Sequence, residues 1–171
     1  MDLKAIIREV PDFPKPGILF YDITTLLSDA AASGYVTDQL SAPYLDRQID
    51  KVVGIEARGF IFGATVATRL NAGFVPVRKP GKLPAEQIQA QYDLEYGKDA
   101  LCIHQDAISP GERVLIVDDL LATGGTMAAT AKLIQRLGGE IVEMACVIEL
   151  PGLKGREKLN GHAVFSLLTY D

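Results

Sequence analysis

The residues that could do chemistry are concentrated between Asp118 and Thr126. Two adjacent carboxylates, Asp118 and Asp119, follow an apolar run, and a short stretch with two glycines leads into a predicted helix. Gly124 and Gly125 allow positive φ and let the backbone come close to a ligand. The first N–H groups of the following helix lack intrahelical acceptors, and the helix dipole favours negative charge there. The pattern therefore predicts a phosphate pocket, made by Ala122, Thr123, Gly124, Gly125 and Thr126.

The two carboxylates need a different partner, because they would repel a phosphate. The hydroxyl groups of a sugar are donors that carboxylates can accept from. A ribose 5-phosphate would satisfy both halves of the motif, with its phosphate in the loop and its 2′ and 3′ hydroxyls on Asp118 and Asp119. Thr126 could either cap the helix or offer its hydroxyl to the anion.

Two other nucleotide-binding motifs are missing from the chain. There is no G-x-x-x-x-G-K-[ST], which argues against a P-loop NTPase, and no G-x-G-x-x-G, which argues against a dinucleotide-binding fold. The alternative without function is a loop whose glycines only turn the chain and whose acids only cap it.

The elements that would position this loop alternate between strands and helices. Such alternation predicts an α/β fold with a central, mostly parallel sheet flanked by helices, and with the ligand beyond the carboxyl ends of the strands. The last helix should bury Met127, Ala131, Ile134 and Leu137 on one face and end at Gly138. We expect strands at 51–55, 74–77, 113–117, 141–150 and 163–168, and helices at 59–70 and 126–137.

Two stretches do not fit the alternation. Residues 11–20 contain three prolines and a glycine, so they cannot form a helix and should make an extended, rigid arm. Residues 78–98 carry Pro80, Gly81, Pro84 and Gly97 among charged side chains. An irregular segment of about 20 residues in a compact domain is more often a functional lid than a plain connector. The alternative is an exposed β-hairpin without a role.

Length, composition and charge limit the remaining possibilities. The chain has 171 residues, 48% apolar and 23% charged, which predicts one folded domain over 1–171. A net charge of −5 disfavours general binding of nucleic acid or of anionic membranes. The longest uncharged stretches, 120–131 and 159–170, are shorter than the ~18 residues that a membrane span needs. The early acid Asp2 and the lack of a long apolar run argue against a secretory signal.

The cysteines and histidines are few. Cys102 and Cys146 stand alone, which favours two buried thiols in a reducing compartment, so we expect a cytoplasmic protein. Because His104 and His162 are the only histidines, a zinc site lacks ligands.

Several motifs, in order along residues 7–170, carry a family resemblance. Residues 117–126 resemble the phosphoribosyl pyrophosphate (PRPP) motif of type I phosphoribosyltransferases. The other segments narrow the resemblance to the adenine phosphoribosyltransferases. They are the base-binding arm (13–20), the pyrophosphate loop (54–60), both ends of the flexible loop (78–84 and 94–98) and a C-terminal segment (153–159).

The resemblance implies the type I phosphoribosyltransferase fold in a single domain, with an N-terminal arm or hood over about 1–30 and a flexible lid loop over about 78–98. The implied reaction converts adenine and PRPP into AMP and pyrophosphate with Mg²⁺, through an oxocarbenium-like displacement at the anomeric carbon. The ion would be held mainly by PRPP, with Asp118 or Asp119 as possible ligands. The sequence does not separate that role from binding of the ribose hydroxyls.

The same resemblance implies roles for individual residues. The catalytic group would consist of Glu95, Asp118, Asp119 and Arg58. Pyrophosphate would be bound by Arg58, Arg78, Lys79, Lys82 and Tyr96, and adenine by Leu19, Phe20, Tyr21 and Leu150. A non-proline cis peptide is expected at Glu56–Ala57, and the family is typically dimeric.

One departure from the family pattern concerns the base. Tyr21 stands where many members have a basic residue, which bears on base selectivity if that side chain contacts adenine. The alternatives are a phosphoribosyltransferase for 6-oxopurines and a PRPP-sensing regulator without enzymatic activity.

The lid residue Glu95 gives the first test. The resemblance places it near the purine N7, where it could move a proton as N9 attacks. Glu95→Gln should therefore lower kcat far more than it weakens PRPP binding, as measured by steady-state kinetics with adenine. A variant with full kcat would refute the assignment.

Overall fold

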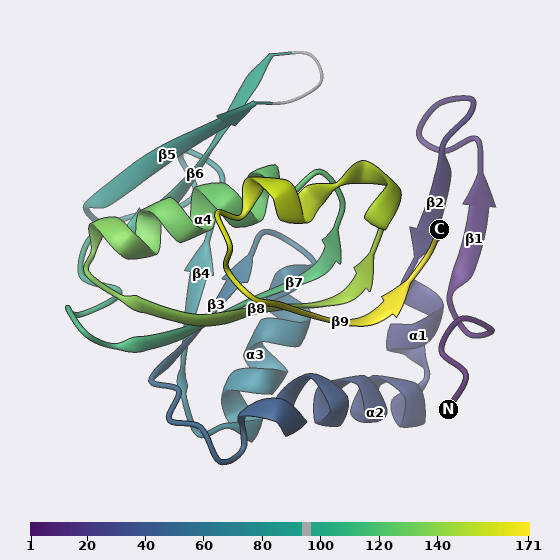
Figure 1. Cartoon of the computed structure of the whole chain (residues 1–171), viewed down its shortest axis with the longest axis horizontal. Coiled ribbons are helices and arrows are strands. Elements are labelled where there is room, and N and C mark those ends of the chain that lie inside the picture. The colour runs from purple at the N-terminus through teal and green to yellow at the C-terminus, as the bar shows by residue number, and fades with distance from the viewer. Residues whose placement is uncertain (94–96) are drawn as a thin grey trace.

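The computed structural model describes residues 1–93 and 97–171, and in that part of the chain five parallel strands form the central sheet (Figure 1). Their order is β4-β3-β7-β8-β9, and every neighbouring pair is parallel. The strands are β3 (Lys51–Ile55), β4 (Gly73–Val77), β7 (Arg113–Leu121), β8 (Glu140–Glu149) and β9 (Val164–Thr169). The expected α/β class and mostly parallel sheet are confirmed.

Helices cover both faces of this sheet. The helices α2 (Ala30–Ser41) and α3 (Gly59–Arg69) lie on one face, and α4 (Gly125–Arg136) lies on the other (Figure 1). Successive side chains of β7 alternate between two apolar cores: Leu115 and Val117 pack on the α2–α3 side, whereas Val114 and Ile116 pack on the α4 side. A strand buried on both faces reads as an unbroken apolar run, which is why β7 is the clearest strand in the sequence.

All seven predicted elements are present, with changes at their ends. β7 runs on to Leu121, so Asp118 and Asp119 belong to the strand rather than to the loop. The helix α4 begins at Gly125, with Gly124 as its N-cap residue at φ 79°. The expectation that Thr126 could cap this helix is therefore wrong, because Thr126 already lies in its first turn. Gly138, at φ 84°, follows the end of α4 as predicted.

The N-terminal arm is a β-hairpin of β1 (Arg8–Pro11) and β2 (Leu19–Asp22), which pair antiparallel. No helix forms between residues 11 and 20, as expected. The structure also contains three helical elements that the sequence analysis did not predict: α1 (Thr24–Ser28), α2 and the short η1 (Ala42–Tyr44). The sequence does contain a signal for α2, because Asp29 accepts a hydrogen bond from the Ala32 N–H at 2.9 Å as an N-cap residue.

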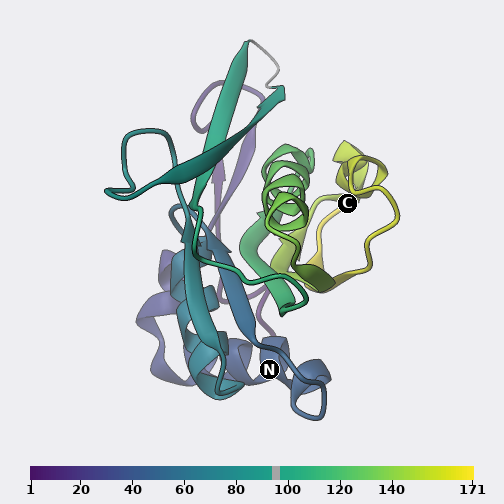
Figure 2. The same cartoon turned by 90° about the vertical axis from the view of Figure 1, so that its left-hand side faces the viewer.

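The segment expected to be an irregular lid is largely a second hairpin. β5 (Gln87–Asp93) and β6 (Lys98–His104) pair antiparallel and project beyond the central sheet (Figures 1 and 2). Arg78 is also fixed, since its backbone exchanges hydrogen bonds of 3.0 and 2.7 Å with Cys102. An irregular stretch over all of 78–98 is therefore wrong. In β5, Ile88, Ala90 and Tyr92 alternate with glutamines, which is the period of a half-buried strand.

The remaining connection, from β8 to β9, contains two short 3-10 helices, η2 (Pro151–Leu153) and η3 (Gly155–Lys158). Cys102 and Cys146 are buried and free, as predicted. Among the described residues, no helix is long and apolar enough to cross a membrane.

Candidate active site

The carboxyl ends of the parallel strands bring the predicted site residues to one edge of the sheet. Arg58 follows β3, Arg78 follows β4, Leu150 follows β8, and the acid pair lies near the end of β7. This edge is where an open parallel sheet places a ligand.

The predicted phosphate loop connects β7 to α4 and lies directly against η3. A Cβ on Gly124 would lie 2.3 Å from the Gly155 carbonyl oxygen, and a Cβ on Gly155 would lie 2.3 Å from the Ala122 carbonyl oxygen. Only glycine fits at either position. Within the described part of the chain, no side chain caps α4, so the N–H groups of its first turn face the loop without a helical acceptor. The loop therefore has the main-chain donors that an anion needs.

The acid pair is enclosed rather than open to solvent, since Asp118 is 7% exposed and Asp119 is 6% exposed. The Oδ2 atom of Asp119 lies 2.6 Å from Nε of Arg58. Oδ1 of Asp118 accepts a hydrogen bond from the Asp119 N–H at 2.9 Å. It also lies against α3, because a Cβ on Gly59 would come within 2.8 Å of it. The two carboxylates therefore differ: one is paired with a cation, and the other is buried against backbone.

Burial raises the pKa of Asp118 well above its usual value, and the neighbouring charge of Asp119 raises it further. The Asp119 N–H and the Arg58 guanidinium oppose this shift without cancelling it. Asp118 therefore keeps a proton at a higher pH than an exposed aspartate does. A protonated carboxyl can both donate to and accept from a hydroxyl group.

The cation Arg78 is held by a carboxylate at the end of β3. Its Nη2 donates to Oε1 of Glu56 at 3.2 Å, and the Lys79 backbone N–H donates to Oε2 of the same residue at 2.7 Å. Burial acts to raise the pKa of Glu56, but the Lys79 N–H and the Arg78 guanidinium outweigh it, so this pKa is lowered. Glu56 therefore stays ionised and ties the end of β3 to the segment that follows β4.

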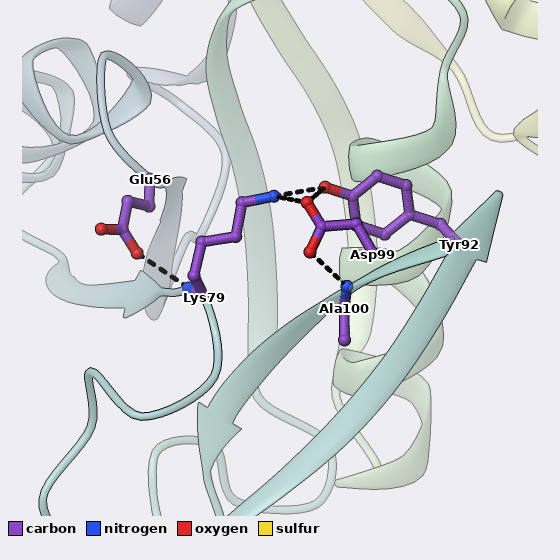
Figure 3. Close-up of polar contacts among 5 residues, drawn as sticks. All are labelled: Glu56, Lys79, Tyr92, Asp99 and Ala100. Atoms are coloured by element: carbon purple, nitrogen blue, oxygen red, sulfur yellow. Dashed lines mark hydrogen bonds and ion pairs between the residues drawn. The ribbon is translucent and has the colours of Figure 1, made fainter. Parts of the chain in front are cut away.

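The side chain of Lys79 points the other way, onto the β5–β6 hairpin (Figure 3). Its Nζ donates to the Tyr92 hydroxyl at 2.7 Å and to Oδ2 of Asp99. The Tyr92 hydroxyl donates to the same Asp99 oxygen at 3.1 Å. Lys79 therefore links Glu56, which follows β3, to the Tyr92–Asp99 pair next to the turn of the β5–β6 hairpin. Lys82 is exposed, and its carbonyl oxygen accepts from Nη1 of Arg78 at 3.3 Å.

An apolar cavity of about 390 Å³ lies under the β1–β2 hairpin. The rings of Phe13 and Phe20 meet edge to face at 5.1 Å, and the Arg58 guanidinium carbon lies 5.5 Å from the centre of the Phe20 ring. A flat, apolar base with polar edges fits such a lining. The cavity is lined by Val10, Phe13, Phe20, Asp22, Ile23, Thr24 and Arg58.

The structure brings only part of the predicted base-binding set to this cavity. Phe20 lines it, but Tyr21 turns away and packs its ring 4.0 Å from that of Tyr170. Leu19 is 42% exposed, and Leu150 packs against the α2–α3 core. Sequence reasoning assigned no role to Val10 or Ile23, although their place beside the proline-rich arm was a usable signal.

Two predicted site residues, Glu95 and Tyr96, lie outside the described residues. Within the described ranges, no group of three or more histidine, cysteine or acidic side chains is placed to hold a metal ion. The peptide bond between Glu56 and Ala57 is cis, as the resemblance implied.

Comparison with known proteins adds independent information. A family model described as a phosphoribosyl transferase domain matches residues 28–168. The adenine phosphoribosyltransferase of Acidobacterium capsulatum is 62% identical over 168 residues, covering 98% of this chain and 93% of its own. The chain belongs to the adenine phosphoribosyltransferase family.

Solved structures of this family have the same fold. The adenine phosphoribosyltransferase of Thermoanaerobacter pseudethanolicus superposes with a TM-score of 0.96 at 53% identity, over 99% of this chain and 98% of its own. The Saccharomyces cerevisiae member, solved with adenine and an imino-altritol bisphosphate, superposes with a TM-score of 0.93 at 43% identity, over 98% and 97%. The sequence-based assignment to the type I phosphoribosyltransferase fold and to this family is therefore confirmed.

The raised pKa of Asp118 predicts a gain in stability on neutralisation. An acid whose pKa is higher in the folded than in the unfolded state destabilises the folded state once the pH rises above the pKa of the unfolded state, here near 3.8. Asp118→Asn keeps an acceptor for the Asp119 N–H and removes the buried charge. At pH 8 it should raise stability by about 1 kcal/mol, or Tm by about 2–4 °C. This gain should vanish below the unfolded pKa.

The measurement is thermal unfolding of both proteins between pH 3 and pH 8. Asp119→Asn is the matched control, because it relieves the same repulsion but loses the ion pair with Arg58, so it should gain less than Asp118→Asn. An Asp118→Asn protein that is no more stable than the parent at pH 8 would contradict the burial argument.

Proposed function

We propose that the protein transfers the phosphoribosyl group of PRPP to adenine in purine salvage, forming AMP and releasing pyrophosphate. One observation carries the proposal: Arg58 lines the apolar cavity and is also paired with Asp119. The base cavity, the acid pair and the phosphate loop that follows the acids are thereby joined at one edge of the sheet. This is the order of base, sugar and phosphate in a nucleotide.

The phosphate end of the ribose would sit on main-chain amides. We assign the 5-phosphate to residues 122–126 because this loop and the first turn of α4 supply N–H donors without a capping side chain in the described ranges. Asp118 and Asp119 would take the ribose hydroxyls. A hydroxyl approaching Asp119 would share that carboxylate with Arg58 or displace it.

The leaving pyrophosphate would be stabilised by cations that are already oriented. As the bond from the anomeric carbon to the pyrophosphate oxygen breaks, its electron pair leaves with pyrophosphate, and N9 of adenine forms the new bond. Arg58, Arg78, Lys79 and Lys82, with Tyr96, are proposed to face the growing negative charge. Arg58, Arg78 and Lys79 each rest on a carboxylate, so binding would exchange one anionic partner for another.

Adenine would stack on Phe20 within the hairpin cavity, beside Phe13 and Ile23. The backbone near Leu19 and Tyr21 would read the edge of the base. Glu95 is proposed to take the proton that the base loses as N9 attacks. Closure of the lid would keep water away from the oxocarbenium-like centre.

We further propose that Mg²⁺ assists the reaction. The chemistry of the donor set fits this ion, because two adjacent carboxylates stand where the diphosphate and ribose oxygens of PRPP would supply the remaining oxygen ligands. Asp118 or Asp119 would then contribute to holding it. When bound, Mg²⁺ neutralises part of the diphosphate charge.

The whole chain would act as one domain in a cytoplasmic homodimer. Light scattering of the purified protein should therefore give a mass near twice 18.5 kDa. A mass of a single chain at micromolar concentration would contradict the dimer.

The activity itself is tested with purified protein, PRPP and Mg²⁺, with adenine and hypoxanthine supplied separately. We expect AMP and pyrophosphate in equal amounts with adenine, and no turnover with hypoxanthine. Turnover of hypoxanthine instead would indicate a 6-oxopurine enzyme. Binding of PRPP without turnover of either base would indicate a regulator.

A further inference from the structure

An ion pair outside the predicted site connects the end of β8 to η3. Glu149, the last residue of β8, is only 6% exposed. The guanidinium of Arg156 donates to both of its carboxylate oxygens, from Nε and Nη2, at 2.6 Å each. The Ser166 hydroxyl of β9 donates to Oε2 at 2.8 Å. A bidentate contact of this kind fixes orientation as well as distance.

The ion pair stays charged and anchors η3 to two strands. The bonds from Arg156 lower the pKa of Glu149 in spite of its burial. Nη1 of Arg156 also donates to the Val164 carbonyl oxygen at 3.1 Å. Arg156 therefore holds its own segment against the ends of β8 and β9.

The residue before Arg156 presses on the phosphate loop. Gly155 is buried, and its backbone meets the backbone of Ala122 and Gly124 with no side chain between them. The Leu150 N–H adds a bond of 3.0 Å to the Leu121 carbonyl oxygen. Because close-packed backbones transmit small shifts, the place of η3 determines the place of the loop.

We propose that Glu149 and Arg156 are positioning residues that hold η3 against the loop 122–124 and thereby set its main-chain donors for the phosphate of PRPP and AMP. The inference rests on the proposed function, because it deepens the role of that same loop. Neither side chain needs to touch the substrate. A main-chain N–H binds a phosphate oxygen less strongly when it is displaced by a fraction of an ångström. Disturbing the ion pair should therefore weaken the binding of phosphate groups.

The sign of the effect separates positioning from simple electrostatics. Glu149 is an anion near the proposed site of another anion, so removing its charge should strengthen PRPP binding by Coulomb's law alone. Positioning predicts the opposite. Glu149→Gln cannot accept both guanidinium bonds, so the KM for PRPP should rise by about tenfold, while kcat at saturating PRPP stays within about twofold.

The experiment compares Glu149→Gln with the full-length parent in steady-state kinetics, calorimetric binding of AMP and thermal unfolding. Glu143→Gln is the matched control. Glu143 also lies on β8 and also forms an ion pair with an arginine, Arg47, at 3.0 Å, but it lies in the first half of the strand, away from η3. The control should leave the KM for PRPP unchanged. Arg156→Lys keeps the charge but cannot make the bidentate contact, and it should weaken PRPP and AMP binding in the same direction as Glu149→Gln.

Several outcomes would overturn the inference. Tighter PRPP binding in Glu149→Gln would leave only the electrostatic effect. A lower Tm with unchanged KM and unchanged AMP affinity would leave only a structural role. If Glu149→Gln does not fold, Arg156→Lys decides alone, and unchanged AMP binding in it refutes positioning. Failure of the proposed function is seen separately, as a parent protein that does not convert adenine.

Discussion

The ion pair between Arg58 and Asp119 is the contact on which the arrangement of the site depends. Asp119 lies near the end of β7, and Arg58 is the N-cap residue of α3, so the pair joins two elements at the carboxyl edge of the sheet. Arg58 then extends to Phe20 of the hairpin. A buried carboxylate without a cation would be costly, and a guanidinium without a carboxylate would not be oriented toward the acids. Each group therefore determines where the other can be.

Carboxylate partners recur around the edge of the sheet. Arg78 rests on Glu56, and Lys79 rests on Asp99. In a chain of net charge −5, this arrangement concentrates cations locally and keeps each one extended before any ligand arrives. The conformational entropy of these long side chains is therefore lost on folding rather than on ligand binding. Lys79 also connects the site to the β5–β6 hairpin, because its backbone N–H donates to Glu56 and its ammonium group contacts Tyr92 and Asp99.

Much of the fold could be predicted because its signals are local. The apolar run of β7 and the glycines around α4 located the central strand, the loop and the helix. The strand was predicted to end at Val117, four residues before the end of β7, because polar residues at the end of a strand resemble the start of a turn. For residues 78–98 an irregular lid was preferred to the alternative of a β-hairpin, because the alternating glutamines of β5 follow prolines and glycines that indicate irregular structure. The signal at Asp29 was present but was not used.

The contacts of the site were less predictable than its residue types. Arg58, Asp118 and Asp119 were predicted as one catalytic group from the resemblance, but no local pattern shows that Arg58 pairs with Asp119 rather than with solvent. The contact between Gly124 and Gly155 joins segments that are about 30 residues apart, so no local pattern predicts it. The bonds from Arg156 to Glu149 likewise form only when η3 packs against the end of β8. The cavity under the β1–β2 hairpin needs these two strands to pair, and the prolines between them gave no sign of that pairing.

A crystal structure of the protein with AMP tests the central claim most directly. The account predicts phosphate oxygens within about 3 Å of the main-chain nitrogens of residues 123–126. It also predicts ribose hydroxyls facing Asp118 and Asp119, and the base against Phe20. A phosphate bound away from this loop, or a base outside the hairpin cavity, would contradict it.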